Sequence, residues 1–549
     1  MPLLTRRSFL VTGIAGLAGT ATATGAVASA VTGFPVAAAV PASRLRTDPF
    51  TLGVASGDPG PGGFVIWTRL APRPLAEDGR GGMPARPFSV RWQIYADERG
   101  RRVVRRGETT AAPAWGHSVH VEVDGLRADR DYWYRFKAGR HVSPMGRART
   151  APHRTSYGSG LTMAFASCAQ YEHGYFTAYR RLAEERPDLI LHLGDYQYEH
   201  RAGGYVIPGG SVRLHEGPET ETLADYRQRH ALYKTDPDLQ AAHAAAPWLV
   251  VWDDHDLDNN WAGAVPERQG GPQARFRRRR RAAFRAYYEN MPLRRRSVPR
   301  GADMQLYRRV RWGRLATFHM LDTRQYRSDQ ACGDGYRNCP QAADPARSII
   351  GGEQERWLLR GLRHSRAQWD IIGQQVFFAQ RDSDTGSAKI TSQDAWDGYV
   401  TSRRRITQGW LDAGVRNPVV LTGDVHAHWA GDLKLDYDDP AAPAVGAELV
   451  TSSISTGGDG GDSDPATHPF LAANPHLRFY NNQRGYVITK IGRGLLSADF
   501  KVLARVTRPG ARAYTRARFL VEDGIPGVRQ AYLRPPDDRA AQAAAEEQA

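Results

Sequence analysis

The sequence predicts an α/β protein, with mixed sheets flanked by helices, preceded by a small β-sandwich domain. Residues 47–152 consist of short runs in which apolar and polar side chains alternate, such as "FSVRWQIYA", with turn residues between them. This is the pattern of half-buried strands. Residues 160–525 instead alternate apolar, strand-like runs with helix-like segments. Several of these runs end in Asp, Cys or His, which is typical of an α/β sheet that carries a ligand site at its strand ends.

The first 40 residues are predicted to be an export signal that is not part of the fold. "TRRSFLV" (Thr5 to Val11) places two arginines before Phe and Leu, and an Ala-, Gly- and Thr-rich stretch follows to about Ala39. This pattern is typical of a bacterial twin-arginine signal, and its moderate hydrophobicity favours cleavage over membrane anchoring. We therefore expect export by the twin-arginine machinery and a secreted or cell-wall-associated protein. No later apolar run is long enough to span a bilayer, so no transmembrane segment is expected in the mature form.

Residues 47–152 are predicted to form a sandwich similar to a fibronectin type III domain. "GLRADRDYWYRF" has the Leu…Tyr-x-Tyr arrangement of a tyrosine corner, a feature of such sandwiches. The segment carries no evident catalytic cluster, so we expect it to be structural.

Residues 160–525 are predicted to form the catalytic domain. Its strands include "LTMAFASC", "LILHLGD", "WLVVWDDHD" and "PVVLTGDVH", and a second, all-β part is expected around "RGYVITKIGRGLLSADFKVL". The tail, residues 526–549, is polar and rich in Ala, and it is predicted to be disordered or loosely helical.

The composition is that of a well-packed globular protein with an excess of positive charge. Apolar residues make up 41% of the chain, and the formal net charge is +16. Such a charge favours anionic partners, but the basic residues are scattered along the chain. We expect no stable nucleic-acid partner, and we expect a monomer.

The sequence predicts one disulfide and one unpaired cysteine. Cys332 and Cys339 lie close together in the loop "ACGDGYRNCP" and are expected to form a disulfide in an oxidising compartment. Cys168 is left over, and an odd cysteine in an exported protein is either buried and inert or chemically employed.

Four apolar runs are each followed by side chains that can bind metal ions. One acidic strand end is commonplace and is explained by a capped turn, but four are hard to explain as solvated loops. Gathered at one sheet edge, so many carboxylates would repel one another without cations between them. The residues are Cys168; Asp195 and Tyr198; Asp253, Asp254, His255, Asp256 and Asn259; and Asp424, His426 and His428.

The types of ligand predict a centre with more than one kind of metal. Cys and Tyr anions suit a transition metal, whereas carboxylates and amide carbonyls suit a hard ion such as Ca²⁺ or Mg²⁺. A mixed centre can polarise a phosphoryl oxygen and hold a hydroxide near neutral pH, so phosphoester hydrolysis is the natural reaction class.

The motifs, taken in order, resemble those of the PhoD family of bacterial alkaline phosphatases, which are metallophosphoesterases. The matching pieces include "LGVASGDP", "ASC", "GDYQYE", "WDDHDLDNNW", "LDTRQYR", "GQQV" and "GDVHAHW", and they run through nearly the whole mature chain. The resemblance implies a metallophosphoesterase-like sandwich and a secreted hydrolase of phosphate esters. It also implies one Fe³⁺ and two Ca²⁺ ions that activate hydroxide for attack on phosphorus.

The resemblance also implies individual roles. Cys168 and Tyr198 would be iron ligands, and Asp195 would bridge iron and calcium at the catalytic centre. Asn259, Asp424 and His426 would be the remaining ligands, chiefly for calcium. An arginine that meets the phosphate would fall within "RFRRRRRAAFRAYY", and we assign it to Arg280, although any member of 277–281 is a candidate.

Some neighbouring residues have plainer explanations. Asp254 and His255 are expected to support the metal-binding loop, and His428 is expected to be a supporting or surface residue. The other arginines of 277–281 are expected to lie on a solvated helix face. The acid and bases of "LDTRQYR" could simply pair with one another.

Two other functions are compatible with parts of this pattern. A non-catalytic binder of anionic polymers would need a basic, aromatic surface but would have no use for the ligand set at the strand ends. A phospholipase D-type or teichoic-acid phosphodiesterase would use the same metals, so the preference for monoesters or diesters depends on the rim of the pocket.

Overall fold

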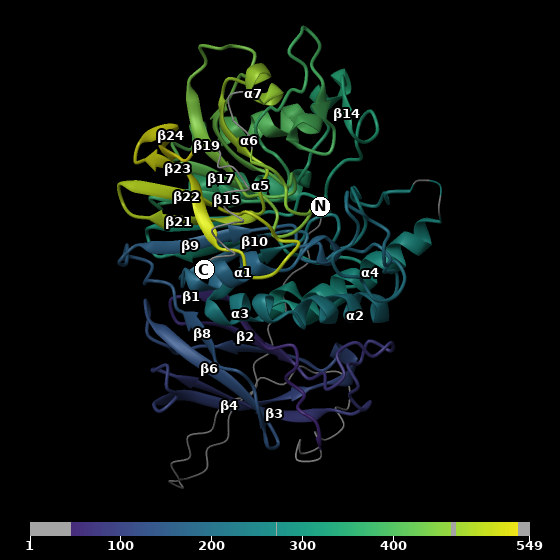
Figure 1. Ribbon diagram of the computed structural model, residues 1–549. Helices are drawn as coiled ribbons and strands as arrows, with labels where there is room; N and C mark the ends of the chain where they lie inside the picture. Colours follow the sequence, from purple (N-terminus) through teal and green to yellow (C-terminus); the bar gives the residue numbers. More distant parts are fainter. Residues whose placement is uncertain (1–44, 269, 271, 463–467, 536–549) are drawn as a thin grey trace, which may run out of the picture. The chain divides into compact units, whose positions relative to one another are not determined.

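The computed structural model describes residues 45–535 except 269, 271 and 463–467. The predicted export signal and the end of the predicted tail lie outside the described residues. The largest element is a ten-stranded sheet with the strand order β24-β23-β22-β21-β9-β10-β11-β1-β2-β5 (Figure 1). Its strands are β1 (Val54–Gly60), β2 (Gly63–Arg69), β5 (Ser118–Val123), β9 (Leu161–Ala166), β10 (Leu189–Leu193), β11 (Pro247–Val251), β21 (Gly485–Ile491), β22 (Leu495–Leu503), β23 (Ala513–Glu522) and β24 (Ile525–Leu533).

A second sheet has seven strands in the order β12-β13-β15-β17-β19-β18-β20. β13, β15, β17 and β19 run parallel, and β12, β18 and β20 are paired antiparallel at the two sides. The strands are β12 (Arg308–Trp312), β13 (Ala316–Met320), β15 (Trp369–Gly373), β17 (Pro418–Thr422), β18 (His428–Lys434), β19 (Ala444–Val450) and β20 (Leu477–Asn481).

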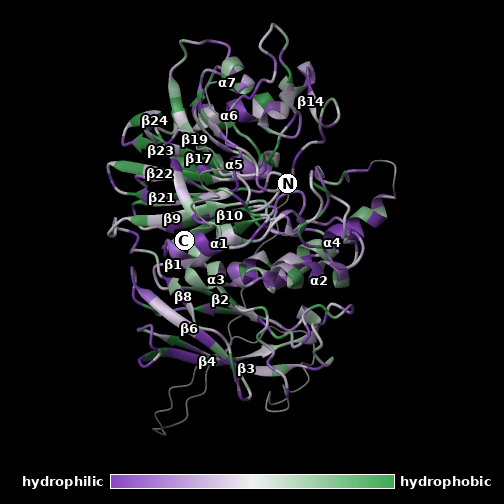
Figure 2. Cartoon of the chain, viewed as in Figure 1, coloured by the Kyte–Doolittle hydropathy of each residue, from purple (hydrophilic) through white to green (hydrophobic). Residues whose placement is uncertain are grey.

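The two sheets pack face to face around one buried core. Side chains in a strand alternate between the two faces of the sheet. In β10, Leu191 and Leu193 belong to the same buried core as Phe318 of the second sheet, and His192 points the other way, where it hydrogen-bonds to Tyr179 of α1. The central strands are fully buried, which explains their continuous apolar sequences (Figure 2).

Helices cover the outer faces of this sandwich. α3 (Pro237–Ala245) packs against β1 and β11, and α1 (Thr177–Glu184) packs against α3 and β21. α2 (Leu223–Lys234) packs against α4 (Gln273–Asn290). On the other side, α5 (Gly351–Arg363) and α6 (Val400–Asp412) bury Leu358 and Trp410 in a core with Val420 of β17. The short α7 (Pro469–Ala473) precedes β20. This arrangement confirms the predicted α/β sandwich with mixed sheets.

The N-terminal region adds a small sandwich, and one of its layers is shared with the large sheet. A five-stranded sheet of β4-β3-β6-β7, with β8 on β6, packs on β1, β2 and β5, so that Phe64 and Ile66 share a core with Val90 and Tyr134. Because β1 also pairs with β11, hydrogen bonding continues from the N-terminal region into the catalytic sheet. The five-stranded sheet consists of β3 (Phe88–Tyr95), β4 (Val103–Ala111), β6 (Asp131–Ala138), β7 (His141–Val142) and β8 (Gly146–Arg149).

The C-terminal end of the fold lies beyond the boundary expected at residue 525. β24 continues to Leu533 and pairs with β23, so the first part of the expected tail belongs to the large sheet. Across the described ranges, no helix combines the length and apolar character needed to cross a membrane.

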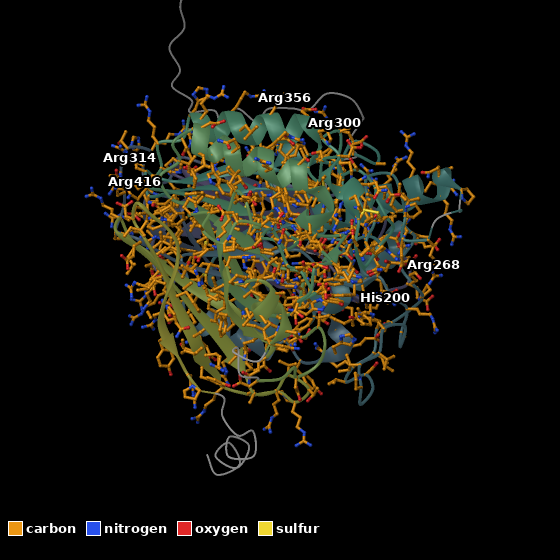
Figure 3. The ribbon with its side chains drawn as sticks, turned by 90° about the horizontal axis from the view of Figure 1, so that it is seen from above. His200, Arg268, Arg300, Arg314, Arg356 and Arg416 are labelled. Atoms are coloured by element: carbon orange, nitrogen blue, oxygen red, sulfur yellow. A yellow bond between two sulfur atoms is a disulfide. The ribbon has the colours of Figure 1, made fainter. Side chains whose placement is uncertain are left out.

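The exposed arginines are spread over the molecule. Arg268, Arg300, Arg314, Arg356 and Arg416 are exposed. In Figure 3, Arg314 and Arg416 lie near each other at one side, Arg300 and Arg356 at another, and Arg268 apart from both pairs. These five arginines therefore do not form a single basic patch.

Candidate metal centre

Both sheets contribute strand ends to one cluster of potential metal ligands. Cys168 follows β9, Asp195 follows β10, Asp253 and Asp254 follow β11, and Asp424 follows β17. Cys168, Asp195 and Asp424 have positive φ values of 60°, 53° and 64°. The left-handed region is uncommon for residues other than glycine and often occurs at functional sites. The chain therefore turns sharply where each of these side chains enters the cluster.

Two glycines allow the loops to approach one another this closely. A Cβ atom on Gly194 would lie 2.3 Å from the Cβ atom of Asp253, and its φ of +110° is one that only glycine adopts readily. A Cβ atom on Gly423 would lie 2.7 Å from Oγ of Ser167. Each glycine precedes a predicted ligand, so larger residues would push the loops apart.

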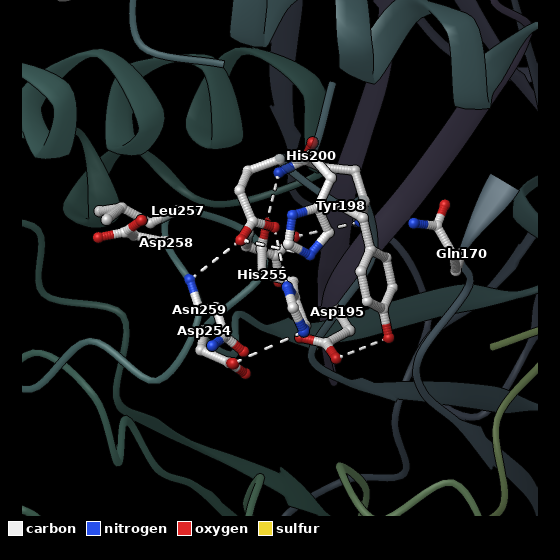
Figure 4. A network of polar contacts seen from close by, with 12 residues as sticks. Gln170, Asp195, Tyr198, His200, Asp254, His255, Leu257, Asp258 and Asn259 are labelled. Carbon is white, nitrogen blue, oxygen red and sulfur yellow. Dashed lines mark hydrogen bonds and ion pairs between the residues drawn. The ribbon is translucent and has the colours of Figure 1, made fainter. Parts of the chain in front are cut away.

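The ligand atoms fall into overlapping groups. Within each of four groups, the ligand atoms all lie within 4.8 Å of one another. Asp195 and Asp254 each belong to two groups, so the groups overlap and form one continuous centre. Figure 4 shows the part of it in which Asp195, Asp254 and His255 lie next to one another. The four groups are Cys168, Asp195 and His426; Asp195, Asp254 and His255; Asp253, Asp254 and Asp424; and Glu199, His200 and His255.

Tyr198 lies at the group that contains the cysteine. Its hydroxyl donates to Oδ2 of Asp195 at 2.9 Å and lies 3.3 Å from Nε2 of His426. Thr456 donates to the same hydroxyl at 2.8 Å, and the phenol ring stacks on His255 at 4.2 Å between centroids. The structure thus brings Cys168, Asp195 and Tyr198 together, and it places His426 beside them, although His426 was expected chiefly among the calcium ligands.

The electrostatics of this cluster fit the presence of cations. Burial, followed by the charge of Asp254, raises the pKa of Asp195 well above its ordinary value. Burial also raises the pKa of Asp424, to about 7, and that of the Cys168 thiol. Oδ1 of Asp195 and Oδ2 of Asp253 are buried without a hydrogen-bond partner. Unpaired buried carboxylate oxygens are costly, and cations between these groups would stabilise the charged forms.

Arg324 supplies part of the positive charge. It is fully buried and lies 2.5 Å from Asp253, 2.8 Å from Asp394, 3.3 Å from Asp254 and 3.6 Å from Asp424. Burial alone raises the pKa of Asp254, but Arg324 and His255 outweigh it and lower that pKa. The sequence did not reveal this role, because the acid and bases of "LDTRQYR" could equally pair with one another. The signal was the position of the motif directly after β13.

The structure does not bring Arg280 to the cluster. Arg280 donates to the carbonyl oxygen of Gly263 at 2.7 Å and to Gln325 at 3.1 Å, and it pairs with Asp303 at 3.4 Å. Its neighbour Arg279 pairs with Asp258. Five consecutive arginines on one helix point in all directions, so sequence alone could not select the one that faces a ligand.

The remaining predicted residues lie at the margin or support the centre. The amide nitrogen of Asn259 donates to Glu267, and its backbone N–H donates to Glu199. Asp254, which was expected only to support the loop, has a ligand atom in two of the groups. His428 is buried in β18 and accepts from the backbone N–H of Ser452 through Nδ1; it is not a surface residue.

A cavity of about 610 Å³ opens beside the cluster. Asp424 and His426 form one side of it, and the buried Arg381 and Arg484 also line it. The loop closed by the disulfide between Cys332 and Cys339 contributes Asp334, Gly335 and Tyr336. This bond confirms the predicted pairing, and Cys168 is free and buried.

Comparison with known proteins agrees with this geometry. The PhoD-like phosphatase family matches residues 163–500, and the N-terminal domain of the same family matches residues 36–152. The chain is 47% identical to alkaline phosphatase D of Bacillus subtilis (strain 168) over 505 residues, which cover 92% of this chain and 85% of that protein. A solved structure of PhoD superposes with a TM-score of 0.87 at 45% identity, covering 92% of this chain and 98% of the other. The chain therefore belongs to the PhoD-like phosphatase family and is a phosphatase.

Proposed function

We propose that the chain is an exported, metal-dependent phosphoester hydrolase whose reaction takes place between the strand-end cluster and the adjoining cavity. The observation that carries this proposal is the junction of two kinds of donor set. Cys168, Tyr198 and His426 provide sulfur, phenol and imidazole donors, while Asp254 and Asp424 provide carboxylates. Asp195 belongs to one ligand group with Cys168 and His426 and to another with Asp254 and His255.

These residues fit one Fe³⁺ ion and two Ca²⁺ ions. The sulfur and phenol donors suit ferric iron, and the carboxylates suit calcium. Asp195 would bridge the two kinds of ion, and the carbonyl of Asn259 would flank the calcium side. When bound, these ions supply Lewis acidity toward a phosphoryl oxygen and an activated nucleophile from water.

The protein itself attracts and orients the substrate. Arg381 and Arg484 line the cavity beside the cluster, so a phosphate group meets positive charge as it enters. Arg324 holds Asp253 and Asp254 in place and is fully engaged by carboxylates, so its role is to position ligands and not to contact the phosphate.

The proposal of export rests on the sequence and on the disulfide. The twin-arginine motif lies outside the described residues, and the bond between Cys332 and Cys339 is typical of oxidising compartments. The family comparisons do not favour a phospholipase D-type or teichoic-acid enzyme, so it is not proposed.

The test is turnover of a monoester and a diester by the mature protein. Purified enzyme supplied with iron and calcium should hydrolyse p-nitrophenyl phosphate, its bis-aryl diester, or both, at alkaline pH. Addition of EGTA should abolish turnover, and excess calcium should restore it. Inactivity on both esters would refute the hydrolase, and full activity in EGTA would refute the calcium assignment.

A further inference from the structure

Part of the cavity wall is aromatic. Four rings from four separate elements line it, together with the imidazole of His468, whose centroid lies 3.8 Å from that of Tyr480. The four rings are Tyr336 of β14 (Tyr336–Arg337), Trp429 of β18, Phe470 of α7 and Tyr480 of β20. Tyr336 and Phe470 stack with centroids 6.0 Å apart, and Trp429 lies 4.7 Å from Tyr480 and 6.0 Å from Phe470. We call these four rings the aromatic wall.

The accessible part of the wall is made by three of the four rings. Trp429 is only 2% exposed and backs the others, whereas Tyr336 is 43% exposed and Phe470 and Tyr480 are half-buried. In the pairing of β18 with β20, Trp429 lies directly opposite Tyr480, so their relative position is set by the sheet. Such rigid, partly exposed rings are suited to stacking against another flat group.

Arg381 lies against this wall and carries a charge that no carboxylate neutralises directly. It is 8% exposed, and its guanidinium carbon lies 5.4 Å from the Phe470 centroid, 5.7 Å from Trp429 and 5.8 Å from Tyr336. Nη2 donates to the hydroxyl of Tyr336 at 2.6 Å. Within the described part of the chain, no carboxylate lies within 4.0 Å of this guanidinium, and its Nε has no hydrogen-bond partner.

The wall and the metal cluster share one cavity. Asp424 and His426 line the same space as the four rings and Arg381, so a phosphoryl group at the cluster would direct its ester group into this space. The Arg381 guanidinium and the aromatic rings both offer flat surfaces on which planar groups stack. Saturated chains and polyols have no π-face with which to make this contact.

We propose that the aromatic wall and Arg381 form a subsite for the organic group of the ester, and that it selects phosphate esters of planar aromatic alcohols or nucleosides over esters of polyols. This inference rests on the proposed hydrolase function and adds a substrate class to it. The residues that determine specificity are Tyr336 and Tyr480, because their rings are partly exposed, and Arg381, because its guanidinium packs against the rings of the wall.

The experiment compares kcat/KM for p-nitrophenyl phosphate, adenosine monophosphate and glycerol phosphate in the metal-loaded enzyme. In Tyr480→Leu and Tyr336→Leu, the ratio of kcat/KM for each aromatic ester to that for glycerol phosphate should fall about tenfold, as expected for the loss of one stacking ring. Tyr480→Phe keeps the ring and should recover most of the loss. Tyr532→Leu, which alters an exposed ring on β24, should leave the ratio as in the wild type.

A binding measurement separates this inference from the proposed function. The ligand is a nucleoside phosphonate, in which carbon replaces the scissile oxygen, and its Kd is measured by calorimetry. The Kd should rise about tenfold in Tyr480→Leu. If the wild type hydrolyses no ester but the Kd still rises, the proposed function fails and the subsite stands. If both the kcat/KM ratio and the Kd stay within twofold of the wild type in both leucine variants, the aromatic subsite is refuted.

Discussion

Replacing Arg324 with methionine should remove the cation that holds the candidate metal centre together. The Arg324 side chain is fully buried and contacts Asp253, Asp254, Asp394 and Asp424 at 2.5–3.6 Å. Methionine keeps an unbranched apolar stem but is shorter and carries no charge, so the variant would leave these carboxylates without their common partner.

The expected cost is large compared with the stability of a typical protein. Removal of one partner from a buried ion pair costs about 3–5 kcal/mol, and native proteins are stable by only about 5–15 kcal/mol. Because the neighbouring acids repel one another, we expect the loss for Arg324→Met to lie at the upper end of this range in low calcium. Added calcium should restore part of the loss, since an ion that binds only the native state stabilises it.

The assay is urea unfolding of the metal-loaded protein at low and at high calcium, with elemental analysis of bound metal. Arg308→Met is the matched control, because Arg308 forms a similarly buried pair with Asp58 at 2.7 Å, and this pair includes no candidate metal ligand. Both variants should be destabilised, but only Arg324→Met should lose metal and regain stability with calcium. A loss below about 1 kcal/mol, or the same response to calcium in both variants, would contradict this account of Arg324.

Three further predictions follow from the same structure. Concentrated iron-loaded enzyme should absorb visible light through its phenolate and thiolate ligands, and Tyr198→Phe should shift or bleach this band; a colourless, fully active enzyme without iron would rule out the ferric site. Replacement of Cys332 and Cys339 by serine should lower the free energy of unfolding by about 2–3 kcal/mol. It should also raise KM for aromatic esters, because Tyr336 lies in the disulfide-closed loop. An unchanged KM would show that this loop does not contribute to the aromatic subsite. Lys234→Met should stabilise the protein, because burial, followed by the charge of Arg69, lowers the pKa of Lys234 well below its ordinary value. The unfolded chain then binds the extra proton below about pH 10, so wild-type stability falls with decreasing pH and the advantage of the variant should be larger at pH 7 than at pH 10. Thermal unfolding at both pH values measures this, and an advantage independent of pH would contradict it.

The sequence alone was enough to select most of the residues that the structure gathers in the candidate metal cluster, because their signal is local. A buried strand followed at once by Cys168, by Asp195 or by Asp424 can be recognised within about ten residues, and parallel strands deliver such residues to one sheet edge. The pairing of Cys332 with Cys339 was predictable for the same reason, since a short loop keeps two thiols close.

Only the tertiary structure decided which charges and rings complete the site. Arg324 meets Asp253 across 71 positions of the chain, and the aromatic wall is assembled from four elements that no periodicity links. The choice of Arg280 failed because consecutive helical residues point in different directions, about 100° apart, and sequence carries no record of which direction faces the site. Likewise, no local pattern shows that β1 pairs with β11. Contacts of this kind depend on how distant elements pack. They form only when the whole core is assembled, because burial in that core supplies the free energy that stabilises them.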